Sequence, residues 1–169
     1  IDYKVPNYEI KEFIDWKQEE INPVVKQKDY SNCVWKVNKK GKAKAKIIGG
    51  NLSSILTILG TEYLPIEVFD NKILFLEDVN ISMGEFDSFM QALRLRGIFK
   101  NIKGLIIGKF VEDDNNIVIN DFLNEFFKED EFPIMYNVDL GHTNPKITIP
   151  IGATAEIECS ENIRFRVEF

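Results

Sequence analysis

The chain has 169 residues, of which 44% are hydrophobic and 12% aromatic, enough to bury one hydrophobic core of ordinary size. Its 27 acidic and 21 basic residues give a net charge of -6, which argues against a general nucleic-acid-binding protein, because phosphate binding requires concentrated positive charge. Every apolar stretch is far shorter than the roughly 20 residues that span a bilayer, so we expect a globular domain with no membrane partner.

The first part of the chain predicts a surface helix followed by strands. Apolar residues at helical spacing indicate a helix over residues 10–20, which Pro23 ends. Trp16 lies beside the apolar stripe, either as a packing anchor or as an aromatic wall for a ligand. Residues 33–37 alternate in the manner of an edge strand. The lysine-rich run over residues 36–46 is interpreted as a solvated edge strand that its charges protect, or alternatively as a contact for an anion or a partner.

A glycine pair and an asparagine join the next predicted strand to the next predicted helix. The strand over residues 43–48 runs into Gly49-Gly50-Asn51, and residues 52–59 predict a short helix. Glycines allow a close approach of the backbone, and the amino end of a helix presents unpaired N–H groups to an anion or a carboxylate. Asn51 is therefore either a ligand contact or simply the helix cap. GxGxxG and GxxxxGK[ST] are absent from the sequence, so no nucleotide fold of the usual kinds is predicted.

Helical and strand patterns alternate through the rest of the chain. A strand over residues 73–76 ends in the acid pair Glu77-Asp78, and Ser82 begins a capping box at the start of a helix over residues 83–96. The remaining predicted elements are a strand, a helix, a strand and an alternating antiparallel tail, at residues 104–110, 119–127, 132–140, 146–149, 153–159 and 163–169. The whole predicts an α/β fold with a mixed sheet, flanking helices and a β-rich carboxyl end.

The cysteines and the first residue bear on the context of the chain. Cys33 and Cys159 show neither CxxC spacing nor neighbouring histidines, so we expect no metal site and no redox pair. Two free, buried thiols are typical of a reducing cytoplasm. Because the chain begins at Ile1 and not at methionine, we expect it to be one domain of a longer polypeptide.

Two residues at predicted strand ends suggest hydrolytic chemistry. His142 is the only histidine and lies in a turn after a strand, and Glu77 ends another strand. An acid that accepts a hydrogen bond from one imidazole nitrogen leaves the other nitrogen to take a proton from a hydroxyl nucleophile. Each residue also has a purely structural interpretation, as a packed histidine or as a carboxylate where a strand meets water. Ser53 and Ser54 do not lie in a G-x-S-x-G elbow, so the nucleophile of such a triad has no candidate here.

Six motifs occur in a characteristic order and spacing between about residue 43 and the end of the chain. They cover residues 47–52, 60–63, 73–78, 95–99, 104–109 and 141–152. Taken jointly, these motifs resemble those of the LD-carboxypeptidase and microcin C immunity proteins, a family of serine peptidases. The resemblance implies that residues 1–169 are the carboxyl-terminal domain of such an enzyme, with a swivelling β/β/α-type fold.

The same resemblance implies roles for three residues. Glu77 matches the acid of the triad, His142 matches the base, and Asn51 matches an asparagine close to the substrate site. The serine nucleophile and the main-chain oxyanion donors would belong to an amino-terminal flavodoxin-like domain that this sequence does not contain. We therefore expect a serine hydrolase without metal or cofactor in the full-length protein, and an inactive chain when these 169 residues are isolated.

Two substrate classes compete within the family that the motifs resemble. One is the murein tetrapeptide, which loses its terminal D-alanine, and the other is an aminoacyl-nucleotide such as processed microcin C. The segment before Gly49 favours the second class, whereas Asn80 and Ile81 stand where a basic residue would be expected for it. Family members are commonly dimers, which makes a homodimer a candidate assembly. The alternative of another class is a non-catalytic binding or dimerisation module of the same fold.

Overall fold

The computed structural model describes residues 1–10, 28–30, 33–109 and 116–168. The helix predicted over residues 10–20, together with Trp16, lies outside the described residues except for its first position. Within the described ranges, no helix is long and apolar enough to cross a membrane.

One mixed sheet organises the described part of the chain, in the strand order β1-β8-β7-β3-β4-β5-β6-β2. The strands β3, β4, β5 and β6 are parallel to one another, and the other neighbours pair antiparallel. The strand bounds are β1 Asp2–Tyr3, β2 Lys36–Lys39, β3 Gly41–Asn51, β4 Ile73–Glu77, β5 Gly104–Gly108, β6 Ile134–Val138, β7 Thr154–Cys159 and β8 Arg164–Glu168.

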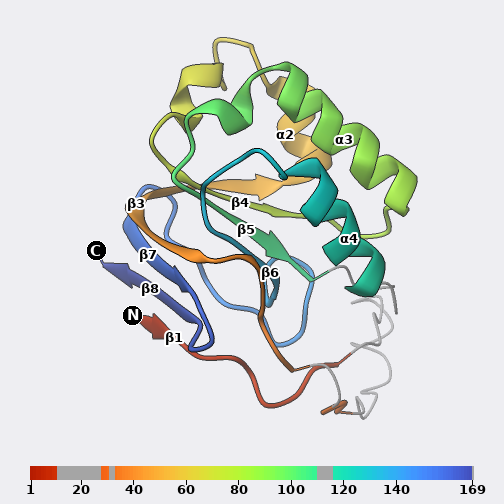
Figure 1. Ribbon diagram of the computed structural model, residues 1–169, viewed down its shortest axis with the longest axis vertical. Coiled ribbons are helices and arrows are strands. Elements are labelled where there is room, and N and C mark those ends of the chain that lie inside the picture. The colour runs from red at the N-terminus through yellow and green to blue at the C-terminus, as the bar shows by residue number, and fades with distance from the viewer. Residues whose placement is uncertain (11–27, 31–32, 110–115, 169) are drawn as a thin grey trace, which may run out of the picture.

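The described helices lie together on one side of this sheet, opposite β7 and β8 (Figure 1). They are the α-helices α2 Leu52–Ile58, α3 Met83–Leu95 and α4 Asn116–Phe126, and the short 3-10 helices η1 Ile66–Phe69 and η2 Ile98–Lys100. The predicted capping box is present at the start of α3, because Ser82 accepts from the backbone of Glu85 while the Glu85 side chain accepts from the backbone of Ser82.

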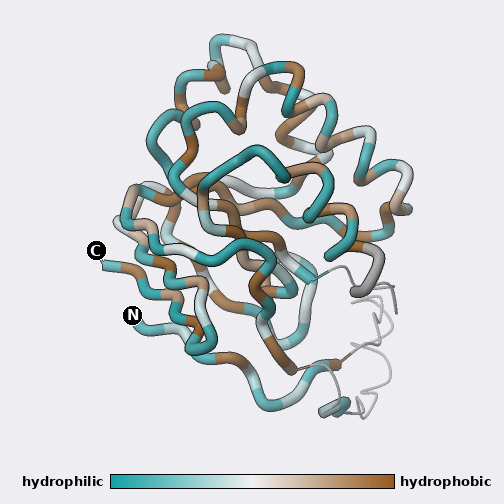
Figure 2. Tube along the Cα trace, in the orientation of Figure 1, coloured by the Kyte–Doolittle hydropathy of each residue, from teal (hydrophilic) through white to brown (hydrophobic). Residues whose placement is uncertain are grey.

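Two hydrophobic clusters lie on the two faces of the parallel strands. Leu74 and Leu76 of β4 belong to the cluster under the helices, whereas Ile73 and Phe75 belong to the cluster shared with β7 and β8. This division follows from the alternation of side chains along a strand. Hydrophobic residues accordingly concentrate along the central strands (Figure 2). The parallel strands thus form a middle layer, with the helices on one face and β7 and β8 on the other. The predicted α/β fold with a mixed sheet and a β-rich carboxyl end is confirmed.

The lysine-rich run forms two strands with different places in the sheet, so its prediction as one edge strand over residues 36–46 is wrong. β2 is an edge strand, but β3 lies between β7 and β4. Residues 41–46 pair antiparallel with β7, and the strand continues from Ile47 as the parallel neighbour of β4. Lys42 extends to Glu158 of β7 at 2.8 Å. The lysines therefore indicate that one face of this segment meets solvent, and not that its edge is unpaired.

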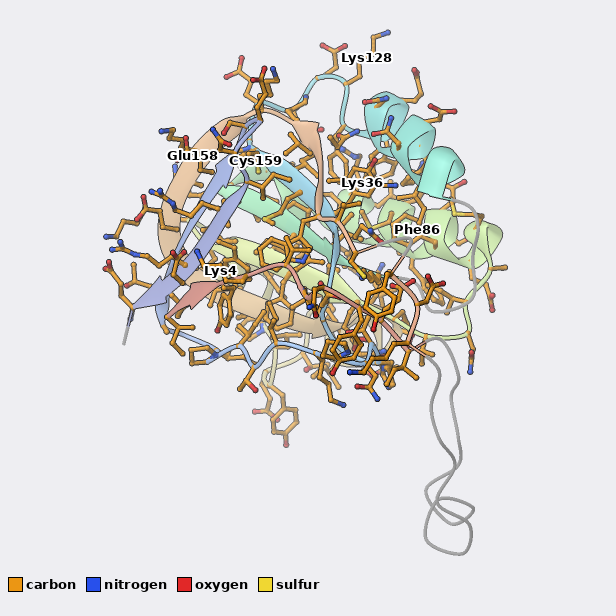
Figure 3. All side chains as sticks on the ribbon, turned by 90° about the horizontal axis from the view of Figure 1, so that it is seen from below. Lys4, Lys36, Phe86, Lys128, Glu158 and Cys159 are labelled. Carbon is orange, nitrogen blue, oxygen red and sulfur yellow. The ribbon has the colours of Figure 1, made fainter. Side chains whose placement is uncertain are left out.

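Two further predictions need correction. Residues 146–149 are not a strand; Ile147 and Ile149 instead pack on the cluster shared with β7 and β8. Their apolar alternation reflects this packing, while the backbone N–H of Ile147 donates to the carbonyl of Asp139. Only one of the two thiols is fully buried, because Cys33 is partly exposed. Cys159, next to Glu158 on β7, is buried (Figure 3).

Candidate active site

Polar residues end the four parallel strands at one edge of the sheet. Asn51 is the last residue of β3 and Glu77 the last residue of β4. Lys109 directly follows β5, and Asp139 directly follows β6. Because these strands run in one direction, their carboxyl ends meet at the same edge. Ligands of open α/β sheets bind outside this edge, which makes it the candidate active site.

Glu77 and His142 are in direct contact at this edge. The Nδ1 atom of His142 lies 2.9 Å from Oε2 of Glu77. The Glu77 side chain is 8% exposed, whereas the His142 side chain is 41% exposed. An ionised carboxylate can only accept, so a neutral His142 donates through Nδ1–H and keeps Nε2 as an unprotonated base. The structure thus brings together the two residues that the sequence suggested as a dyad.

Two glycines make room for the Glu77 side chain. Gly141 has a left-handed φ of 69°, and a Cβ built there would lie 1.8 Å from Oε2 of Glu77. A Cβ at Gly108 would lie 3.0 Å from Cβ of Glu77. Only glycine satisfies both the backbone conformation and the close approach at position 141. The residue before His142 therefore sets how near the imidazole can come to its carboxylate.

Asp78, the residue that follows β4, points to the opposite face of the sheet from Glu77. Successive residues of a strand point to opposite faces, so Asp78 is directed toward the helical side, to the start of α2. Its Oδ1 accepts from Nδ2 of Asn51 at 3.0 Å, and its Oδ2 accepts from the backbone N–H of Ser53 at 2.9 Å. Asn51, which is paired in register with Glu77, is held in place by this carboxylate.

Asn51 caps α2, as one of its two sequence interpretations predicted. Its Oδ1 accepts from the backbone N–H of Ser54 at 3.0 Å. The hydroxyl groups of Ser53 and Ser54 donate to the same oxygen, at 2.9 and 2.8 Å. Both serines thus serve the helix cap, which agrees with their exclusion as nucleophiles. One N–H of the Asn51 amide donates to Asp78, and the other is the group that it can offer to a ligand.

Sequence reasoning assigned no role to Asp78, Lys109 or Asp139. Their common signal was available, since each is the first residue after a strand of the parallel set. Asp78 continues the alternation of faces of β4, which distinguishes it from Glu77. Among the residues that the structure describes, no group of three or more His, Cys, Asp or Glu residues could hold a metal ion.

Comparison with known families assigns the chain. Residues 44–157 match the family described as LD-carboxypeptidase C-terminal domain. The chain belongs to this LD-carboxypeptidase family. Its fold and the order of its motifs agree with that membership.

Individual relatives of this LD-carboxypeptidase domain are longer than the chain. It is 29% identical over 161 residues to the microcin C7 self-immunity protein MccF of Escherichia coli, covering 92% of this chain and 45% of that protein. It is 37% identical over 125 residues to the putative carboxypeptidase YocD of Bacillus subtilis, covering 72% of this chain and 38% of that protein. A solved structure of MccF in complex with aspartyl sulfamoyl adenosine matches at a TM-score of 0.82 and 26% identity, covering 99% of this chain and 50% of that one. The chain spans half or less of the length of these relatives.

Proposed function

We propose that this chain is the carboxyl-terminal domain of a Ser-His-Glu serine hydrolase and supplies two of the three triad residues. Glu77 is the acid and His142 the base, while an amino-terminal domain of the longer protein supplies the serine and the oxyanion donors. The observation that carries the proposal is the 2.9 Å contact between Nδ1 of His142 and Oε2 of Glu77. Membership of the LD-carboxypeptidase family supports it.

The contact between Glu77 and His142 supports general-base catalysis by His142. The buried Glu77 carboxylate accepts from Nδ1–H, holds the imidazole in one tautomer and stabilises the imidazolium that forms when Nε2 takes the serine proton. The serine oxygen then bonds to the acyl carbon, and His142 returns the proton to the leaving group as the acyl bond breaks. Water repeats the sequence to release the acyl group. The half-exposed imidazole leaves Nε2 accessible to a nucleophile from another domain.

For the substrate, we propose an aminoacyl-nucleotide of the microcin type. Nearly the whole length of this chain matches half of MccF, and MccF has been solved with aspartyl sulfamoyl adenosine. The remaining N–H of Asn51 would donate to an acceptor on the acyl or linking group. The second candidate is a murein tetrapeptide cleaved as by an LD-carboxypeptidase. It is favoured by the uncharged residues 79–82, which offer no cation to a phosphate.

The test is a hydrolysis assay on the full-length protein, with processed microcin C and a murein tetrapeptide as separate substrates. His142→Ala should lower kcat by about 1,000- to 10,000-fold on the true substrate, since general-base help and the triad geometry are lost together. Glu161→Gln, at an exposed glutamate outside the six motifs, is the control and should leave kcat unchanged. Retention of more than a tenth of the activity by His142→Ala would favour the alternative, a non-catalytic binding or dimerisation module.

A cytoplasmic homodimer completes the proposal. Both cysteines of the chain are free, which fits a reducing compartment. Tyr63, Leu95 and Ile151 expose 80%, 87% and 65% of their surface, more than large apolar residues usually do. Analytical ultracentrifugation of the full-length protein should give the mass of two chains, and a single-chain mass at micromolar concentration would contradict this part.

A further inference from the structure

A buried group of charged residues lies at the same edge of the sheet and takes no part in the mechanism above. Lys109 Nζ lies 2.7 Å from Oδ1 of Asp139 and 3.0 Å from Oε2 of Glu9. The exposed fractions of these side chains are 6% for Lys109, 0% for Asp139 and 10% for Glu9. Trp35 Nε1 donates to the second oxygen of Asp139 at 2.8 Å. We call Lys109, Asp139 and Glu9 the Lys109 cluster.

Stability alone does not explain why three charges are buried together. Burial by itself lowers the pKa of Lys109, but its contacts with Asp139 and Glu9 outweigh this effect, and the pKa is raised above the ordinary value. Lys109 is therefore a cation between two carboxylates. Buried ion pairs often contribute less to stability than apolar residues of similar volume, whereas they can specify one geometry of the chain.

The Lys109 cluster holds the segment that carries His142. Asp139 stands at the start of this segment, and its carbonyl accepts from the backbone N–H of Ile147 at 2.9 Å, which closes the loop around His142. The residue after Glu9, Ile10, donates its backbone N–H to the carbonyl of Asn144 in the same loop, at 2.7 Å. The cluster thus connects to the start of the loop through Asp139 and to a point near its end through Ile10, the residue after Glu9.

We propose that Lys109 is a positioning residue for His142. By fixing Asp139 and Glu9 on either side of the loop, Lys109 keeps Nδ1 of His142 directed at Oε2 of Glu77. The inference rests on the proposed function, because it concerns how the base of that dyad is oriented. Without the Lys109 cation, the two buried carboxylates repel each other, the loop is released, and His142 turns toward solvent.

The tautomer of His142 is the measurement that tests this role. His142 is the only histidine of the chain, so long-range ¹H–¹⁵N spectra of the neutral imidazole report on it without ambiguity. The contact with Glu77 requires the proton on Nδ1, whereas an imidazole free of this contact prefers the proton on Nε2. We expect the Nδ1–H form to dominate in the wild-type chain and to become the minor form in Lys109→Met.

Three variants complete the experiment. Lys103→Met removes an exposed lysine just before β5, the strand that Lys109 follows, and should leave the His142 tautomer as in the wild type. Ser82→Ala weakens the α3 cap away from the cluster and controls for lost stability, again with no change of tautomer. Asp139→Asn removes one charge, keeps the side-chain shape, and should lower the Nδ1–H fraction less than Lys109→Met does. It carries the test if Lys109→Met does not fold.

The outcomes separate the two proposals. If the wild type shows Nδ1–H and both Lys109→Met and Asp139→Asn retain it, the positioning role of Lys109 is wrong while the dyad stands. If the wild-type chain itself shows the Nε2–H form, the Glu77–His142 dyad of the proposed function fails, and the positioning role fails with it. A loss of Nδ1–H in the two cluster variants alone supports the role.

Discussion

The two halves of β3 pair with their neighbours in different ways within the one mixed sheet. Residues 41–46 read Gly-Lys-Ala-Lys-Ala-Lys and pair antiparallel with β7, with the lysines toward solvent. From Ile47 the strand reads Ile-Ile-Gly-Gly-Asn and pairs parallel with β4, which is buried throughout. The first half must fit the core on its inner face alone, because Ala43 is buried while the lysines meet solvent, whereas the second half must match close neighbours on both faces. The polar residue at the end of the second half belongs to the candidate site, and no residue of the first half does.

The largest effect that this comparison predicts is at Gly49. A Cβ there would lie 1.8 Å from the backbone carbonyl oxygen of Phe75, and backbone cannot move aside as a side chain can. Gly49→Ala should lower the free energy of unfolding by about 3 kcal/mol, measured by urea denaturation. Gly84→Ala is the control, because Gly84 lies in α3, a Cβ there would come no closer than 4.0 Å to the Ser82 hydroxyl, and alanine favours helix. A loss below about 1 kcal/mol in Gly49→Ala would mean that the two halves are equally tolerant.

A second prediction concerns the inner face beside the antiparallel half. Burial raises the pKa of the Cys159 thiol to about 12. The thiolate is the reactive form, so iodoacetamide at pH 8 should alkylate Cys159 at least about 100-fold more slowly than the partly exposed Cys33. Mass spectrometry of native and urea-unfolded protein gives both rates, and the difference should vanish on unfolding. Equal native rates would show that this face is open to solvent.

The smallest effect is expected on the outer face of the antiparallel half. Lys42 donates to Glu158, which lowers the pKa of that carboxyl. A lowered pKa in the folded state contributes stability at neutral pH that is lost as the pH falls through the folded-state value. Because Lys42 is exposed and Glu158 partly so, Lys42→Ala should unfold within error of the wild type at pH 7. The comparison of the two halves would need revision if thermal unfolding showed a clear loss there.

The dyad was predictable from the sequence because each of its two residues stands out from the residues next to it. Glu77 interrupts an apolar strand, and His142 is the only histidine, displayed in a turn with glycine before it. Parallel strands collect such residues at one edge, so two strand ends far apart in the chain meet in space. The motifs of the family supplied the pairing and the roles.

The missed features depend on pairing that no local pattern contains. The lysine run indicates an exposed face. Its place in the sheet depends on pairing with β7, which lies more than one hundred residues later in the chain. The register of β6 shifts before Val138, at Asn137, which adopts a left-handed φ of 60°. Such a bulge re-aims the side chains that follow it, here at the approach to Asp139. The positions of Lys109 and Asp139 after parallel strands were visible in the sequence, but the contact of Glu9 with them was not.

Glu77 contacts His142 and Asp78 contacts Asn51, and this difference limits how the length of β4 can vary. Glu77 and Asp78 are adjacent in the chain and point to opposite faces of the sheet. The position of each residue along the alternation that β4 sets therefore decides which carboxylate contacts His142 and which contacts Asn51. A single inserted or deleted residue in this strand would exchange the faces of the two acids without changing the composition of the site. Length changes within β4 are therefore expected only in pairs. The number of residues in β4 is as much a part of the site as their identity.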